Sequence, residues 1–183
     1  MMSTRAAVGL GALVAGVLAV GSACSVSETL DAPRCTSNSS EVLISAQSVP
    51  TASLLVCFDT LPTGWSVGTV DIGDAGTTVV FDSDRAGPSA ARFQYAATCD
   101  IGAATQTPTD FESADRFEWV QEVQPRFRAN RYYRFEGGCV IWEFDFDSDA
   151  PAAMAVELGH SLQLVDRAEV NADMRAVFVD EDL

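Results

Sequence analysis

The N-terminal segment constrains this chain most, because it determines the compartment in which the rest must fold. Residues 1–5 (MMSTR) carry one positive charge and no acidic residue, and residues 6–23 are uncharged and rich in Ala, Val, Leu and Gly. A basic start, an apolar run and small residues before a cleavage point are typical of an export signal. We therefore predict that residues 1–23 form a signal peptide and that the domain folds outside the cytoplasm, where disulfides form and persist.

Cys24 directly follows this segment, in the sequence VGSAC (residues 20–24). The arrangement resembles a bacterial lipoprotein signal, in which the cysteine becomes the lipid-modified first residue of the mature chain, although such signals usually carry Leu where Gly21 stands. We expect Cys24 to be acylated. Two alternatives stay open: ordinary cleavage after Ala23, and an uncleaved anchor, because the 18 residues from 6 to 23 fall within the range of about 17–25 that can span a bilayer. All three place the domain on the extracytoplasmic side of the membrane.

Cysteine counting supports lipidation. Acylation of Cys24 removes one of five cysteines and leaves Cys35, Cys57, Cys99 and Cys139, which can pair in three ways. We favour Cys35–Cys57 and Cys99–Cys139, because each bridge joins segments that the strand pattern brings together, and each would contribute about 2–4 kcal/mol. A catalytic thiol or a zinc site is the alternative, and no CxxC spacing supports it.

The mature chain has the size and charge of a single acidic domain. Removing 23 of 183 residues leaves 160, with 10 basic and 26 acidic residues, so the formal charge changes from −15 to −16. Such a field repels nucleic acid and anionic lipid headgroups. Every basic residue is an arginine, which excludes Schiff-base lysine chemistry and a P-loop.

The sequence divides into the signal peptide (residues 1–23), a lipidated cysteine with a polar tether (24–40) and one extracytoplasmic domain (41–183). Within the domain, Glu41–Ser48 is compatible with a short helix or a strand, and short runs rich in Val, Phe, Tyr and Thr predict strands. The predicted strands are Ser53–Asp59, Trp65–Asp71, Thr77–Asp82, Ala90–Thr98, Arg116–Val123, Phe127–Glu136 and Cys139–Phe146. We expect an α+β fold with a largely antiparallel sheet of six or seven strands, one or two C-terminal helices and two disulfides.

The segment RYYRFEGGCVIWEF (131–144) predicts a hairpin with Gly137-Gly138 as its two-residue turn. That register pairs Phe135 with Val140, Tyr133 with Trp142 and Arg131 with Phe144. The expected core face carries Tyr133, Phe135, Val140, Trp142, Phe144 and Phe146. The opposite, wetter face carries Tyr132, Arg134, Ile141, Glu143 and Asp145.

A helix is predicted at residues 151–164 after this hairpin. Asp149 is a candidate N-cap and Pro151 suits the first turn. Helical spacing aligns the apolar residues Met154, Leu158, Leu162 and Val165 against the sheet. A weaker helix is predicted over Ala168–Phe178, with Val170, Met174 and Val177 on one side.

Gly64–Gly68 (GWSVG) matches the GxSxG nucleophile elbow of α/β-hydrolases, with Ser66 as nucleophile and His160 later in the chain. That chemistry requires a strand, a tight turn and then a helix, whereas β-like sequence follows here. We therefore favour a turn that leads Trp65 and Val67 into a strand. A secreted hydrolase using Ser66 or paired carboxylates is the alternative function. His160 has no second histidine near it and is expected to be an ordinary, partly exposed side chain.

Carboxylates alternate in WEFDFDSD, from Glu143 to Asp149. The D-x-D-x-D run resembles the start of an EF-hand loop, but Ala150 and Val156 stand where the loop needs Gly and Glu. Asp145, Asp147 and Asp149 are therefore weak candidates for metal binding. A solvated strand face leading to a helix N-terminus explains these residues better, and a glycosidase acid pair is a further alternative.

Four arginines, Arg126, Arg128, Arg131 and Arg134, lie in RFRANRYYRF (126–135) beside Tyr132 and Tyr133. They suggest either a local anion or glycan site or, as we favour, cross-strand pairing with Glu143 and its neighbours.

Three blocks together resemble an uncharacterised family of actinobacterial envelope proteins, which are lipoproteins or single-pass membrane proteins. The blocks are Ala46–Val67 with its LPxGW element, Phe81–Asp110 with its CD element, and Arg131–Phe146 with its GGCV element. The resemblance covers most of residues 41–175, places Cys57, Cys99 and Cys139 at recurring positions and transfers no catalytic residue.

These observations predict a non-catalytic envelope module that needs no cofactor. It would contact the membrane through its lipid and bind an envelope protein or a small ligand, but not nucleic acid. A calcium-stabilised module is a third hypothesis.

Overall fold

The computed structural model describes residues 32–35, 40–147 and 149–172. Cys24, the signal peptide and most of the predicted tether lie outside these residues. The predicted α+β class is confirmed: the structure contains a large antiparallel sheet, a two-stranded sheet, short helices and two disulfides. Among the described residues, no helix is both long enough and apolar enough to cross a membrane.

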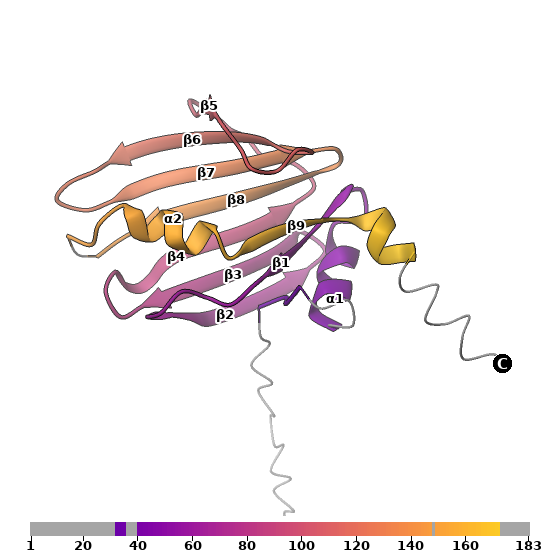
Figure 1. The fold of residues 1–183 in the computed structure, drawn as a ribbon, viewed down its shortest axis with the longest axis horizontal. Coiled ribbons are helices and arrows are strands. Elements are labelled where there is room, and N and C mark those ends of the chain that lie inside the picture. The colour runs from indigo at the N-terminus through magenta and orange to yellow at the C-terminus, as the bar shows by residue number, and fades with distance from the viewer. Residues whose placement is uncertain (1–31, 36–39, 148, 173–183) are drawn as a thin grey trace, which may run out of the picture.

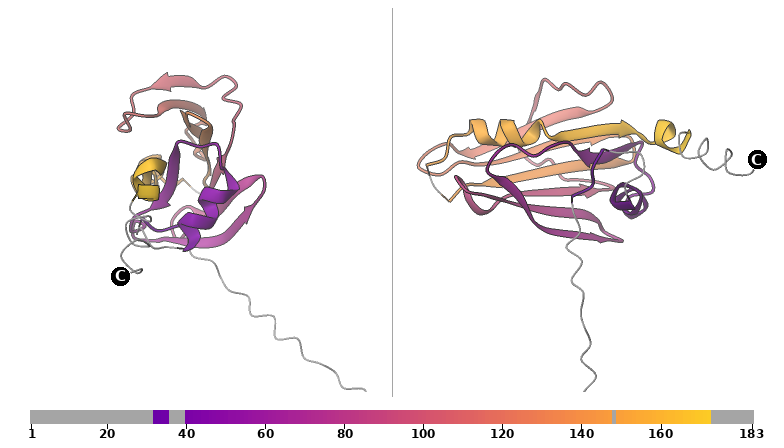
Figure 2. Two further views of the ribbon diagram at one scale, coloured as in Figure 1. Left: turned by 90° about the vertical axis from the view of Figure 1, so that its right-hand side faces the viewer. Right: turned by 60° about the horizontal axis from the view of Figure 1, so that its bottom comes forward.

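The elements occur in the order α1 (Ser40–Ser48), β1 (Leu54–Phe58), β2 (Trp65–Gly73), β3 (Gly76–Ser83), β4 (Gly87–Ala96), β5 (Thr105–Thr107), β6 (Asp115–Glu122), β7 (Arg128–Phe135), β8 (Gly138–Asp145), α2 (Ala153–Gly159) and β9 (Leu162–Asp166). The large sheet has the strand order β2-β3-β4-β8-β7-β6-β5, and every neighbouring pair is antiparallel. β1 and β9 form a separate antiparallel ribbon. The ribbon and α2 lie across one face of the sheet (Figure 1), and the sheet curls around them (Figure 2).

The core lies between this concave face and the ribbon. Alternate residues of the strands point inward, and the inward set includes Val79, Phe81, Phe93, Tyr95, Val140, Trp142 and Phe144, all buried. Phe58 at the end of β1 inserts among these rings. Its ring centroid lies 5.3 Å from Phe81, 4.9 Å from Phe93 and 5.9 Å from Trp142, each in an edge-on arrangement. Met154 and Leu158 of α2 complete this core, as predicted.

Both predicted disulfides are present. Cys35 is bonded to Cys57 in β1, with a Cα–Cα distance of 4.9 Å, and Cys99 is bonded to Cys139 in β8, with a distance of 5.9 Å. The first bridge holds the C-terminal part of the predicted tether, which contains Cys35, against the ribbon. The second fixes the β4–β5 connection to the convex face of the sheet. Because each of these four cysteines is bonded to another, none of them is a catalytic thiol or a zinc ligand in this structure.

The predicted register of the β7–β8 hairpin is wrong by two residues. Phe135 pairs with Gly138 and Tyr133 with Val140, so the two-residue connection is Glu136-Gly137. Because side chains alternate with a period of two, the predicted core face keeps its residues. The two glycines serve different needs: Gly137 has φ +65°, whereas Gly138 begins β8 where a Cβ would meet Ala52 and the Phe135 ring.

The hairpin pattern placed Tyr132 on the wetter face of the sheet. This prediction is wrong, because Tyr132 is buried at 6% exposure. Its cross-strand neighbour on the convex face is Phe117 of β6, which is also buried. Apolar contact with β6 therefore covers this part of the convex face. The sequence of the β7–β8 hairpin alone does not show that β6 lies beside it.

The predicted helix at 151–164 is only partly correct, because α2 ends at Gly159. Leu162 and Val165 belong to β9, where they pair with Phe58 and Leu55 of β1. Asp149 is not the N-cap; Ala152 occupies that position without a side-chain hydrogen bond. The buried run of β1 requires a strand partner, and this tertiary demand overrides the helical spacing.

Residues 167–172 are helical, which agrees with the start of the second predicted helix. Met174, Val177 and Phe178 lie outside the described residues.

Arg167 joins α1 to the ribbon. Its NH2 donates to the carbonyl oxygens of Ala46 and Val49 at 3.0 and 2.7 Å, and its Nε donates to that of Ala52 at 2.6 Å. A cation beside the last carbonyls of a helix is favourable. Nearby, the hydroxyl of Tyr95 donates to the carbonyl of Leu54 at 2.9 Å. Burial raises the pKa of Tyr95 and the charge of Arg167 partly opposes this rise, so the phenol remains a donor at neutral pH.

The β7–β8 turn provides a stability test. Gly137→Ala and Gly102→Ala both place alanine at positive φ, +65° and +52°. A Cβ at Gly102 meets nothing within 4 Å, whereas a Cβ at Gly137 meets the carbonyl of Thr51. We expect Gly102→Ala to cost about 1–2 kcal/mol from backbone strain, and Gly137→Ala to cost a further 1–3 kcal/mol or so from displaced backbone. Urea unfolding measures both, and equal costs would contradict the close approach.

Candidate functional site

Ser66 does not occupy a nucleophile elbow. The turn at Gly64 (φ +85°) leads directly into β2, which confirms the predicted turn and strand. Trp65 and Val67 point into the core, so the exposed Ser66 between them points to the convex side. His160 follows α2, which covers the concave side. The sheet therefore separates the two residues that a hydrolase would need together.

The acidic candidates also serve other contacts. Arg126 NH2 lies 3.0 Å from Asp145 Oδ1 and 3.2 Å from Asp147 Oδ1, and Arg128 Nε lies 3.7 Å from Asp145 Oδ1. Asp149 lies in the loop before α2. No group of three or more His, Cys, Asp or Glu side chains that could hold a metal is found among the residues that the structure describes.

The arginine cluster is divided between the two faces of the sheet. Arg134 points outward, with NH2 at 3.7 Å from Asp115 Oδ2 and its guanidinium over the Phe117 ring at 5.0 Å. Arg131 points inward. The predicted pairing of these arginines with Glu143 is wrong, because Glu143 takes part in none of the ion pairs between the described residues. The neighbouring acid Asp145 pairs instead, with Arg126 and Arg128.

Arg131 lies at the base of a cavity of about 480 Å³, here called the β7–α2 groove. β6 and β7 form one wall, and the end of α2 with β9 forms the other. Arg116, Arg131 and Tyr133 come from the sheet, and Val156, His160 and Leu164 from the opposite wall. Asp110 and Phe111, which precede β6, lie at the rim.

One carboxylate holds two guanidiniums in this groove. Arg131, only 4% exposed, donates from Nε and NH2 to Glu118 Oε1 at 3.0 and 2.9 Å. Arg116 donates from NH2 to Glu118 Oε2 at 3.1 Å. Arg131 NH1 also lies 3.5 Å from the carbonyl of Ala155 in α2. A buried guanidinium is tolerated only with such partners, and together the three side chains keep one formal positive charge.

Strand alternation and one glycine position these groups. Arg131 and Glu118 are direct cross-strand neighbours, and Arg116 lies two residues before Glu118 on the same face. At Gly159, where α2 ends, a Cβ would lie 2.5 Å from Arg131 NH1. The helix therefore ends where the arginine needs space.

Two polar atoms at this end of the sheet have no hydrogen-bond partner. They are Nε of Arg116 and Oγ1 of Thr107, both buried, and their residues are cross-strand neighbours on β6 and β5. Buried polar groups are nearly always paired in native proteins, so exceptions indicate a missing water, ion or ligand. Arg116 thus has unused hydrogen-bonding capacity beside the groove.

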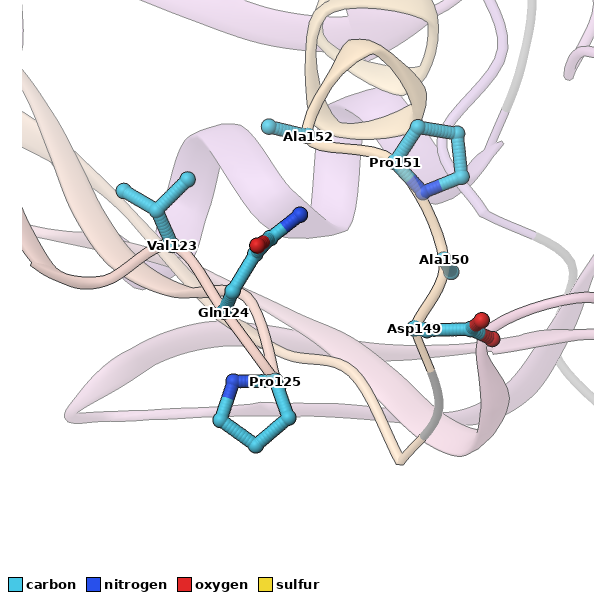
Figure 3. Close-up of a pocket in the computed structure, with 7 residues that line it drawn as sticks. All are labelled: Val123, Gln124, Pro125, Asp149, Ala150, Pro151 and Ala152. Carbon is cyan, nitrogen blue, oxygen red and sulfur yellow. The ribbon is translucent and has the colours of Figure 1, made fainter.

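A second cavity, of about 740 Å³, lies between the β6–β7 turn and the loop before α2. Gln124 extends from the turn toward this loop, but the carboxylate of Asp149 points away from it (Figure 3). The other side chains that line it are Val123, Pro125, Ala150, Pro151 and Ala152. The lining thus directs no charged group inward that could orient a ligand, and the β7–α2 groove is the stronger candidate.

No family model, no curated protein and no solved structure matches this chain.

Sequence reasoning identified Arg131 but not its partners. Arg116 and Glu118 fall within the predicted strand Arg116–Val123, and Asp110 and Phe111 lie outside every predicted element. The alternation R-F-E-W at 116–119 was the available signal, because it places an arginine and a glutamate together on one face.

The ion pair between Arg131 and Glu118 predicts that removing Arg131 destabilises the fold more than removing Arg134. Arg131→Met removes the buried cation and breaks its two bonds to Glu118, so we expect a loss of about 3 kcal/mol in the free energy of unfolding. Arg134→Met removes the same charge from an exposed pair and should cost less than about 1 kcal/mol. Chemical unfolding of both variants tests this difference, and a cost for Arg131→Met as small as that for Arg134→Met would show that the contact is not stabilising.

Proposed function

We propose that this chain is a membrane-anchored, extracytoplasmic binding module without catalytic activity, and that it binds a small ligand in the β7–α2 groove. One observation carries the proposal: a nearly inaccessible Arg131, ordered by Glu118, is built into the wall of a cavity beside Arg116, whose side chain is partly exposed there. Preorganised polar groups in a mainly apolar cavity are typical of ligand sites.

The cysteines support an extracytoplasmic location. Cys35, Cys57, Cys99 and Cys139 are joined in two bridges, and such bridges persist in oxidising compartments. This pairing leaves Cys24 as the remaining cysteine of the sequence, in agreement with its use as the lipid attachment point. The resemblance to actinobacterial envelope lipoproteins supports the same location.

The positions of Ser66 and His160 favour binding over the hydrolase alternative. The two side chains belong to opposite sides of the large sheet, so His160 does not activate Ser66 as a general base. Asp145 and Asp147, the other candidate catalytic acids, are engaged with Arg126.

Intact-mass analysis of the protein from its native membrane tests the anchor. We expect the chain to begin at Cys24, to carry acyl groups, and to gain four hydrogens on reduction because two disulfides open. Cys24→Ala should abolish acylation and leave the domain disulfides unchanged. A non-acylated chain starting at Cys24 would support ordinary secretion, and a retained N-terminus would support the single-pass alternative.

A fluorophosphonate probe tests the absence of serine hydrolase activity. We expect no covalent labelling of the folded protein, because Ser66 lies within a strand and His160 belongs to the other side of the sheet. The Ser66→Ala variant gives the background and a known serine hydrolase confirms the activity of the probe. Labelling that disappears in Ser66→Ala would favour the hydrolase alternative.

A further inference from the structure

We propose that the ligand of the β7–α2 groove is a small zwitterion with an apolar side group, that is, an apolar α-amino acid, either free or as a short peptide with both ends free. This inference rests on the proposed function and identifies the class of ligand. Three parts of the groove carry it: a cationic base, an anionic rim and apolar walls.

Arg116 is suited to the carboxylate. It lines the groove with its side chain 23% exposed, and its one hydrogen bond within the described chain goes from NH2 to Glu118. Arg131 is already committed to Glu118 and Ala155, so it fixes the geometry and leaves Arg116 to receive the ligand. Guanidinium–carboxylate contacts are strong because they are charge-assisted and frequently bidentate.

Asp110 is suited to the ammonium group. It lines the groove, is exposed, and forms no ion pair with the described residues. The net charge of the protein then distinguishes a zwitterion from a simple anion. At −15, the protein repels a free anion over several ångströms, whereas a zwitterion carries no net charge and brings a cation for Asp110.

The walls are suited to an apolar side group. The rings of Phe111 and Tyr133 meet edge to face at 5.4 Å on the sheet side. Val156, 45% exposed, and Leu164 face them from the ribbon side. Apolar surface exposed inside a concave site is favourable to cover, which accounts for a valine left open on α2.

Four related compounds separate these contributions: phenylalanine, phenylalaninamide, N-acetylphenylalanine and N-acetylphenylalaninamide. Calorimetric titration of the full chain at pH 7, where an α-amino group with a pKa of about 7.7–8.0 is mostly protonated, measures their affinities. We expect phenylalanine to bind at least about tenfold more tightly than either singly blocked compound, since each loses one charged hydrogen bond. The dipeptide Ala-Phe serves as a second arm, and tighter binding than phenylalanine would identify a peptide rather than a free amino acid.

Two variants assign each end of the ligand. Arg116→Gln should reduce the affinity for phenylalanine about tenfold or more and remove the preference for phenylalanine over its amide. Asp110→Asn should reduce it similarly and remove the preference over the acetylated compound. Arg92→Gln and Asp74→Asn, which change the same charges at exposed positions elsewhere, are the controls and should leave affinity within about twofold. Thermal melting confirms that each variant is folded, and Asp110→Asn, at an exposed site, keeps the test valid if Arg116→Gln is unstable.

The outcomes separate this inference from the proposed function. If N-acetylphenylalanine binds as tightly as phenylalanine and depends on Arg116, the groove is a ligand site but takes anions, and the zwitterion proposal is wrong. If none of the compounds binds at millimolar concentration, the amino-acid class is excluded, while acylation of Cys24 still decides the membrane-anchored role. Equal effects of the groove variants and their controls would exclude the groove itself.

Discussion

The burial of one guanidinium is the main constraint on the structure around the β7–α2 groove. Arg131 lies on the concave face of the sheet, next to Trp142 and beneath α2, where an unpaired charge is not tolerated. Glu118 compensates it from the next strand, and Gly159 gives it space at the end of α2. α2 ends at this glycine, the chain turns into β9, and the groove lies between the sheet and these two elements. The ionic contact thus supplies a buried charge to the wall of the groove.

The second constraint is the pairing of β1 with β9, which come from opposite ends of the domain. Each of the five residues of β1 is buried, so this strand depends on a partner for its backbone hydrogen bonds. β9 provides that partner only after the whole large sheet has been synthesised. The Cys35–Cys57 bridge and the contacts of Arg167 then fix the two ends of the ribbon to the rest of the fold. Long-range closure of this kind is slow to form.

The sequence predicted those features that depend on local alternation. It identified most strands of the large sheet, the inward aromatic residues of β7 and β8, and both disulfides, but it left Glu41–Ser48 open between a helix and a strand. The prediction failed where contacts between distant segments of the chain determine the local structure. Leu162 and Val165 match helical spacing, yet they form a strand because β1 lacks another partner. Tyr132 alternates like an exposed residue, yet Phe117 beside it makes that position apolar. Predicting Glu118 as the partner of Arg131 would have required the β6–β7 register, which no local pattern specifies.

The ribbon also determines how a bound ligand would be oriented relative to the proposed membrane anchor. Phe58 of β1 has two lateral neighbours: Arg34, near the end of the predicted tether, and Leu162 of β9. β1 therefore lies between the point where the tether enters the domain and the strand that lines the groove. A domain held through Cys24 would attach on the far side of the ribbon from the groove.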